Sequence, residues 1–183
     1  MVTMTKTYDL THLRRVARRS GAKLNMLMCY AIGRAASDFK EFYMLPVGDK
    51  LMQFDHLAVN TIVRTETGGI NTCDIPFSRD IRAFAADYLR LTAEAARSNE
   101  ELNLGDDYMV IGTSALTKCE LDSVVNLYAG FYNNPFVVWG KYRKGLWRTT
   151  LPISFQFHHT QMDGPISTGF LNRLQEVFNE IEF

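Results

Sequence analysis

The chain has 183 residues, an apolar fraction of 46%, and equal numbers of basic and acidic residues, 20 of each. This length and composition are typical of one domain, residues 1–183, with a single core, and the balanced charge gives no field that favours nucleic acid or an anionic membrane. The sequence has no apolar run of membrane-spanning length and no signal peptide near its first residue, so we expect a cytoplasmic protein.

Two short helices are predicted near the N-terminus. Asp9 can cap the first, and Asn25 can cap the second, which continues over residues 26–37. The basic run RRVARR belongs to the solvated face of the first helix, which argues against a nucleic-acid site. The residues that share the opposite face are Leu10, Leu13, Val16 and Ala17.

The middle of the chain changes from strand patterns to a helix pattern. Residues 41–55 are typical of a hairpin that turns at Gly48, and residues 57–65 of the strand that follows. Residues 80–97 predict a helix, because their apolar positions recur with helical spacing. These positions are Ile81, Phe84, Tyr88, Leu91 and Ala95.

The last third of the chain predicts three strands and a closing helix. The strands cover residues 107–116, 133–142 and 147–157, and the last two are joined over RKG. The helix follows Asp163 at its N-cap, with Pro165 in the first turn. Strands and helices mix without a regular βαβ alternation, so we expect an α+β two-layer sandwich whose mixed, mainly antiparallel sheet is covered by helices.

The cysteines give no sign of a disulfide framework or a thiolate zinc site. Cys29, Cys73 and Cys119 are odd in number, far apart in sequence, and lack any CxxC pairing. We therefore expect buried free thiols and no metal site.

Two of the four histidines stand together in the stretch FQFHHTQMDGPI. Phe155 and Phe157 alternate with polar residues, as in a half-buried strand, and the apolar pattern stops at His158 and His159. A turn at Asp163-Gly164 follows. The histidines thus lie where a strand ends, which is a common place for exposed chemistry.

Four interpretations of this pair remain open from the residues alone. His158 and His159 can be an ordinary strand-end pair, with one ring packed and the other solvated. A shared metal ion is disfavoured, because neighbouring strand residues point to opposite faces. Ser123 or Ser167 can be a nucleophile activated by a histidine, although no G-x-S-x-G elbow is present. The fourth interpretation is a lone histidine base in a loop held by Asp163.

The segment HHTQMDG resembles the HHxxxDG motif of the chloramphenicol acetyltransferase family. The resemblance extends in order along nearly the whole chain. It includes the first two helices, the hairpin FYMLPVGDKLMQFD, the pair of strands around NNPFVVWGKYRKGLWRTTLPIS, and the closing helix with RLQE. Condensation domains of peptide synthetases and the acyltransferase cores of 2-oxoacid dehydrogenase complexes share the motif and the fold. The chain is short for a condensation domain, and no lipoyl region precedes the core, which argues against a dehydrogenase complex. We therefore expect a small free-standing acetyltransferase.

The family resemblance implies a reaction and a base. An acetyl group passes from acetyl-CoA, as co-substrate, to a hydroxyl of a small acceptor such as a chloramphenicol-type alcohol. No cofactor is bound permanently. The second histidine of the motif, His159, would remove the hydroxyl proton, and an imidazole suits that task near neutral pH. The family is typically a homotrimer whose sites lie between neighbouring subunits, and the apolar stretch 126–139 can form an interface, a pocket wall or core.

The resemblance also implies roles for four other residues. Ser123, in ELDSVVN, would stabilise the oxyanion, although a turn serine explains it equally well. Asp163 would hold the histidine loop, and it can also cap the closing helix. Lys141 and Tyr142 would lie toward the coenzyme channel, where a cation can meet a phosphate, although exposure at a hairpin end is the simpler interpretation.

The sequence departs from the family pattern in ways that support a second hypothesis. The chain starts after the family's N-terminal arm and first strand, so Asp163 is expected to lack its basic partner. Either Arg34 or Arg173 replaces that partner, or Asp163 is exposed. Val138 stands where the family has a threonine. A catalytically weak or inactive member of the same fold, acting as a binding or assembly protein, is therefore the alternative to an enzyme.

Overall fold

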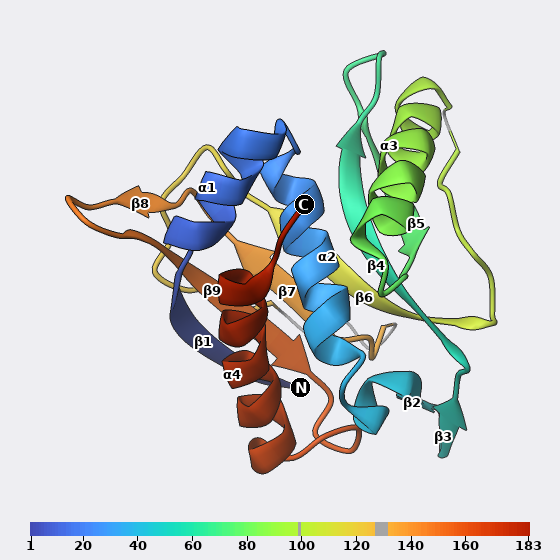
Figure 1. The fold of residues 1–183 in the computed structure, drawn as a ribbon. Helices are drawn as coiled ribbons and strands as arrows, with labels where there is room; N and C mark the ends of the chain where they lie inside the picture. The colour runs from blue at the N-terminus through green and yellow to red at the C-terminus, as the bar shows by residue number, and fades with distance from the viewer. Residues whose placement is uncertain (99, 127–131) are drawn as a thin grey trace.

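The computed structural model describes residues 1–98, 100–126 and 132–183 (Figure 1). The N-terminal elements are β1 (Val2–Asp9), α1 (Thr11–Ser20), α2 (Leu24–Ala36), the 3-10 helix η1 (Lys40–Tyr43), β2 (Met44–Val47) and β3 (Lys50–Gln53). The central elements are β4 (His56–Arg64), β5 (Ile70–Pro76), α3 (Ile81–Arg97) and β6 (Tyr108–Ala115). The chain closes with β7 (Phe136–Trp139), β8 (Arg143–Lys144), β9 (Thr149–Phe157) and α4 (Gly164–Glu180).

One mixed sheet forms the first layer of the fold. Its strand order is β1-β9-β7-β6-β4-β5, and β8 also pairs with β9. The β4–β6 and β6–β7 pairs are parallel and the others are antiparallel. The helices form the second layer: α1, α2 and α4 pack on one another, with α4 against β1 and α2 against β4 and β6, and α3 packs on β5 (Figure 1). This arrangement confirms the expected α+β sandwich.

The strand β9 lies inside the sheet and is buried on both faces. On the helix side, Phe155 is fully buried, with its ring centroid 4.7 Å from that of Phe170 and 5.9 Å from that of Phe42. On the other side, Ser154 is 4% exposed and Gln156 is 6% exposed. The expectation of a half-buried strand is therefore wrong, because the segment 121–126 covers the second face through hydrogen bonds to both of these polar side chains.

Residues 2–9 form an edge strand that the sequence patterns did not indicate. β1 pairs antiparallel with β9 along its whole length, from Val2 opposite Phe157 to Asp9 opposite Thr150. β5 was also missed. By contrast, the predicted hairpin is confirmed as β2 and β3, with Gly48 at a positive φ of 61° in its turn.

Two predicted helix caps differ in detail. Leu10 is the N-cap of α1, and Asp9 instead accepts a hydrogen bond from the Thr11 N–H at 2.8 Å. Asn25 does not cap α2, which begins at Leu24. Its amide donates to the hydroxyls of Thr61 and Tyr88 at 3.1 and 3.0 Å. Asn25 is placed inside the helix because its polar partners come from β4 and α3, which local sequence does not reveal.

The three thiols are free, as expected, but they are not all buried. Cys29 and Cys73 are buried, whereas Cys119 is exposed. Among the described residues, no group of three His, Cys, Asp or Glu side chains could hold a metal ion. No helix in the described ranges is long and apolar enough to cross a membrane.

Asp38 joins α2 to α4 through a cluster of guanidinium groups. Its carboxylate accepts from Arg34 at 2.7 Å, from Arg79 at 3.0 Å and from Arg173 at 3.0 Å. Burial opposes ionisation of Asp38, but the hydrogen bonds from the three arginines outweigh it and hold its pKa below the usual value. Arg173 also pairs with Glu176 of its own helix at 2.9 Å. This cluster fastens the helix that follows the histidine loop.

We expect Phe155→Ala to lower the free energy of unfolding by about 3–5 kcal/mol, because it leaves a cavity among buried aromatic rings. Equilibrium urea unfolding at a fixed protein concentration measures this change. Phe183→Ala is the control, since that ring is 42% exposed, and its effect should stay within about 0.5 kcal/mol. A loss below about 1 kcal/mol for Phe155→Ala would contradict the packing described for β9.

Asp38→Asn should lower the free energy of unfolding by about 1–2 kcal/mol at neutral pH, because three guanidinium groups lose a carboxylate that is 28% exposed. The folded-state pKa of Asp38 lies below the usual value of an aspartate side chain. The stabilisation is therefore complete above that value and is lost as the pH falls through the lower, folded-state pKa. Urea unfolding of both proteins across this range should show the difference shrinking on acidification. The control is Asp87→Asn, which breaks an exposed ion pair with Arg90. If the stability difference between Asp38→Asn and the unaltered protein did not change with pH, the stabilising role of the Asp38 cluster would be contradicted.

Candidate functional site

The double histidine lies in the turn between β9 and α4, directly after the last residue of the buried strand. The His158 carbonyl accepts the N–H groups of Gln161 and Met162 at 2.9 and 3.3 Å, which closes the turn. Gln161 and Met162 are 4% and 3% exposed. The turn therefore has a buried second half and a first half that carries the two imidazoles.

The two histidines have different surroundings. His158 is partly buried, and its Nδ1 accepts the Thr160 N–H at 3.2 Å. Desolvation, followed by the N-terminal ammonium and His159, lowers the pKa of His158. His159 is exposed, and its ring has no hydrogen-bond partner within residues 1–98, 100–126 and 132–183. His158 is therefore tied to the turn, and His159 is the imidazole available to an incoming group.

Asp163 is the N-cap of α4, as predicted. Its Oδ1 accepts the Ile166 N–H at 3.0 Å, and its side chain is exposed. Neither Arg34 nor Arg173 takes the place of a basic partner, because both bind Asp38. Of the two outcomes expected for this carboxylate, the exposed one is observed.

Ser167, the other serine considered as a nucleophile, is fully buried. Its hydroxyl donates to the Gly164 carbonyl at 3.0 Å and lies 3.6 Å from the sulfur of Met4. These contacts fix it inside the first turn of α4, where an incoming molecule cannot reach it.

Ser123 lies some distance from His159 within one chain. It is exposed, and the next residue, Val124, donates its N–H to the Ser154 hydroxyl at 2.8 Å. This bond places Ser123 beside the middle of β9. From Ser154 the strand runs three more residues to Phe157, about 10 Å at the rise of an extended strand, before the turn that carries His159.

Lys141 and Tyr142 lie near the start of β9, at the end opposite the histidines. Lys141 is exposed, and the Tyr142 ring lies 4.1 Å from the guanidinium carbon of Arg14. The adjacent residue Arg143 pairs with Thr150 in the sheet and binds Asp122 at 2.6 Å, close to Ser123. The predicted site residues thus form two groups: Lys141 and Tyr142 lie near the start of β9 and Ser123 beside its middle, whereas His159 and Asp163 follow its end.

Val138 and the apolar stretch 126–139 are only partly described. Val138 is 3% exposed and pairs with Ser154, on the face of the sheet opposite the helices. Residues 127–131 of the stretch lie outside the described residues, so its expected contribution to an interface or pocket wall stays a prediction.

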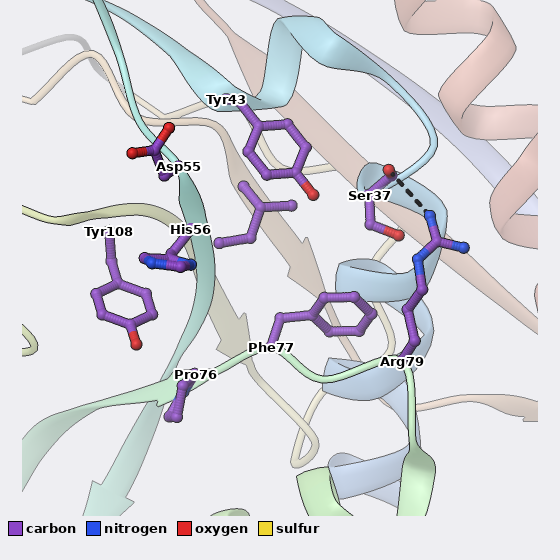
Figure 2. A pocket seen from close by; sticks show the side chains of 9 residues that line it. Ser37, Tyr43, Asp55, His56, Pro76, Phe77, Arg79 and Tyr108 are labelled. Atoms are coloured by element: carbon purple, nitrogen blue, oxygen red, sulfur yellow. Dashed lines mark hydrogen bonds between the residues drawn. The ribbon is translucent and has the colours of Figure 1, made fainter.

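A cavity of about 230 Å³ lies beside η1, apart from both groups (Figure 2). Its side chains come from η1, from the starts of β4 and β6, and from the segment around Arg79. The Arg79 guanidinium donates to the Ser37 carbonyl at 3.3 Å (Figure 2). None of the predicted site residues lines this cavity. Its lining residues are Ser37, Tyr43, Asp55, His56, Leu57, Pro76, Phe77, Arg79 and Tyr108.

Gln161 is a residue of the turn that sequence patterns did not single out. It occupies a variable position of HHxxxDG, and its side-chain amide crosses to η1 and β2. No local pattern signals such a contact, because its acceptors are backbone carbonyls more than a hundred residues away in the chain.

Comparison with known proteins identifies the family and the fold of the chain. A family model described as chloramphenicol acetyltransferase matches residues 1–175. Chloramphenicol acetyltransferase 3 of Escherichia coli is 30% identical over 182 residues, covering 96% of this chain and 84% of that protein. A solved chloramphenicol acetyltransferase structure, 22% identical, superimposes with a TM-score of 0.82 over 97% of this chain and 87% of that one.

The fold is shared more widely than the family. The structure of a probable dihydrolipoamide acetyltransferase from Listeria monocytogenes superimposes with a TM-score of 0.78 at 13% identity, covering 99% of this chain and 85% of that one. That likeness concerns the fold alone. The family model and the relative from E. coli together show that this chain belongs to the chloramphenicol acetyltransferase family of acyltransferases.

Proposed function

We propose that this protein transfers the acetyl group of acetyl-CoA to a hydroxyl of a small acceptor, with His159 as the general base. The observation that carries the proposal is the exposed imidazole of His159, which stands without a partner in the described residues at the end of a rigid, buried strand. Its neighbour His158 is tied to the turn by Thr160. Family membership supports the acyl chemistry, and chloramphenicol is one acceptor to test.

The chemistry of the transfer requires a base and an oxyanion donor. The imidazole of His159 takes the proton of the acceptor hydroxyl as its oxygen attacks the thioester carbon. The tetrahedral intermediate then collapses, the C–S bond breaks, and the proton passes to the departing thiolate. A hydroxyl donor such as Ser123 would stabilise the negative charge on the carbonyl oxygen. Lys141 would meet a phosphate of the coenzyme. No permanently bound cofactor enters this scheme.

The two groups of site residues favour a site built between subunits. Ser123 lies beside the middle of β9, whereas His159 follows its end, so the two side chains are set apart along the strand. A closed ring of identical subunits can bring the serine of one copy to the histidine of the next. We therefore propose a homotrimer, in which each site takes its two halves from two chains.

A second candidate function is a weak or inactive member of the family that serves in binding or assembly. The apolar side chain of Val138 and the exposed carboxylate of Asp163, which lacks an ion-pair partner in the described residues, favour it. The same assay distinguishes the two candidates.

His159→Ala should reduce kcat by about 10²–10⁴-fold, because the reaction loses its base. The measurement is thiol release from acetyl-CoA with a panel of alcohols that includes chloramphenicol. His56→Ala is the control, since this exposed histidine lies on β4, and it should leave kcat unchanged. Unaltered turnover in His159→Ala would remove the residue from its role. Absence of thiol release in the unaltered protein with every alcohol would favour the second candidate.

Ser123→Ala should lower kcat by roughly 10²–10³-fold through loss of an oxyanion donor. Co-expression of two variant chains tests more directly whether one site takes residues from two subunits. When His159→Ala and Ser123→Ala chains are co-expressed in equal amounts, about a quarter of the sites in a cyclic trimer combine an intact serine with an intact histidine. Activity should return to about that fraction of the unaltered level. A mixture no more active than its two parents would argue against a shared site.

A further inference from the structure

Asp163 does not attach the loop that carries His158 and His159 to the rest of the protein. The Asp163 carboxylate is exposed and accepts the N–H of Ile166, within its own helix. It therefore caps α4 but does not connect the loop to the body of the protein. Met162 is buried and anchors the loop through apolar packing, which has no preferred direction. A directional contact must come from another residue.

Gln161 makes that contact, two residues after His159. Its Nε2 donates to the Met44 carbonyl at 2.6 Å and to the Glu41 carbonyl at 3.2 Å. These acceptors belong to β2 and η1, and η1 is itself anchored by the fully buried ring of Phe42. The amide thus bridges the loop to a segment that packs into the core.

The orientation of this amide is set by its acceptors. Gln161 Oε1 is buried and has no hydrogen-bond partner among the described residues. If the amide were turned over, the oxygen would face two carbonyl oxygens and both hydrogen bonds would be lost. An unsatisfied buried acceptor is costly, so the two donated bonds dominate the placement of this side chain. The backbone N–H of Gln161 also donates to the His158 carbonyl at 2.9 Å, which couples the bridge to the histidines.

We propose that Gln161 is the positioning residue for His159 in the proposed acetyl transfer. Its amide fixes the loop on η1 and β2, and so fixes where the imidazole stands beyond the end of β9. Gln161 itself does not touch the reacting atoms. This inference rests on the proposed function for its kinetic consequence, but the bridge can be tested without turnover.

The first test compares Gln161→Leu, which keeps the approximate volume and removes both donors, with a matched control. The control is Asn71→Leu, because the Asn71 amide also bridges backbone carbonyls, those of Ala95, Ser98 and Glu100, at 2.9–3.1 Å. Gln161→Leu should lower kcat by roughly 10- to 100-fold, with KM for acetyl-CoA changed by less than about twofold. Asn71→Leu should show a loss of stability without that loss of kcat. Equal kcat values in the two variants would overturn the proposal.

The second test compares the activity of Gln161→Glu with that of the unaltered enzyme as a ratio, so that pH effects common to both proteins cancel. An ionised carboxylate would face two carbonyl oxygens, whereas a protonated carboxyl group can donate one hydrogen bond to the Met44 carbonyl. The activity of Gln161→Glu divided by that of the unaltered enzyme should therefore rise as the pH falls from about 8 to about 6. This variant retains a donor at low pH even if Gln161→Leu fails to fold. A ratio that is constant with pH would contradict the bridge.

Hydrogen exchange distinguishes a failure of the Gln161 bridge from a failure of the proposed acetyl transfer. In Gln161→Leu the backbone amides of Gln161 and Met162 should exchange at least about tenfold faster, while those of β9 stay unchanged. If the unaltered protein releases no thiol but this local change is observed, the acetyl transfer fails and the bridge stands. If the enzyme is active and exchange in the loop is unaltered, the bridge fails and the acetyl transfer stands.

Discussion

The strand β9 is buried on both faces, with Phe155 packed among aromatic rings on the helix side and Ser154 bonded to the covering segment on the other. β1 and β7 pair with its two edges, so its backbone hydrogen bonds are made inside the sheet. A strand held in this way has little freedom to shift. The position of the imidazoles that follow it is therefore set by the core, and the short turn transmits that position to the surface.

The turn itself combines three kinds of contact. Backbone hydrogen bonds to the His158 carbonyl set its shape, Met162 provides apolar burial, and the Gln161 amide provides direction. The Asp38 cluster holds α4 against α2 and so limits movement of the helix that leaves the turn. An exposed base can be well positioned when the groups on either side of it are buried. In this physical sense the His159 imidazole can be well positioned while it remains open to solvent.

The separation of Ser123 from His159 changes how the site must be understood. Within one chain, Ser123 lies beside the middle of β9 and His159 follows its last residue. The cavity beside η1 is lined by none of the predicted site residues, and the ring of subunits proposed above would bring the two unlike halves together.

The amino-acid sequence by itself determined the features that depend on local pattern. Helical spacing predicted α3 and α4, the Gly48 turn predicted the β2–β3 hairpin, and HHTQMDG at a strand end predicted the loop that carries His159. Only the tertiary structure decided four other features: the pairing of β1 with β9, the inward placement of Asn25, the cover over Ser154, and the bridge from Gln161 to Met44. The physical reason is that periodicity reports which face of an element is apolar, whereas the partner of a polar group or a strand edge depends on segments far away in the chain.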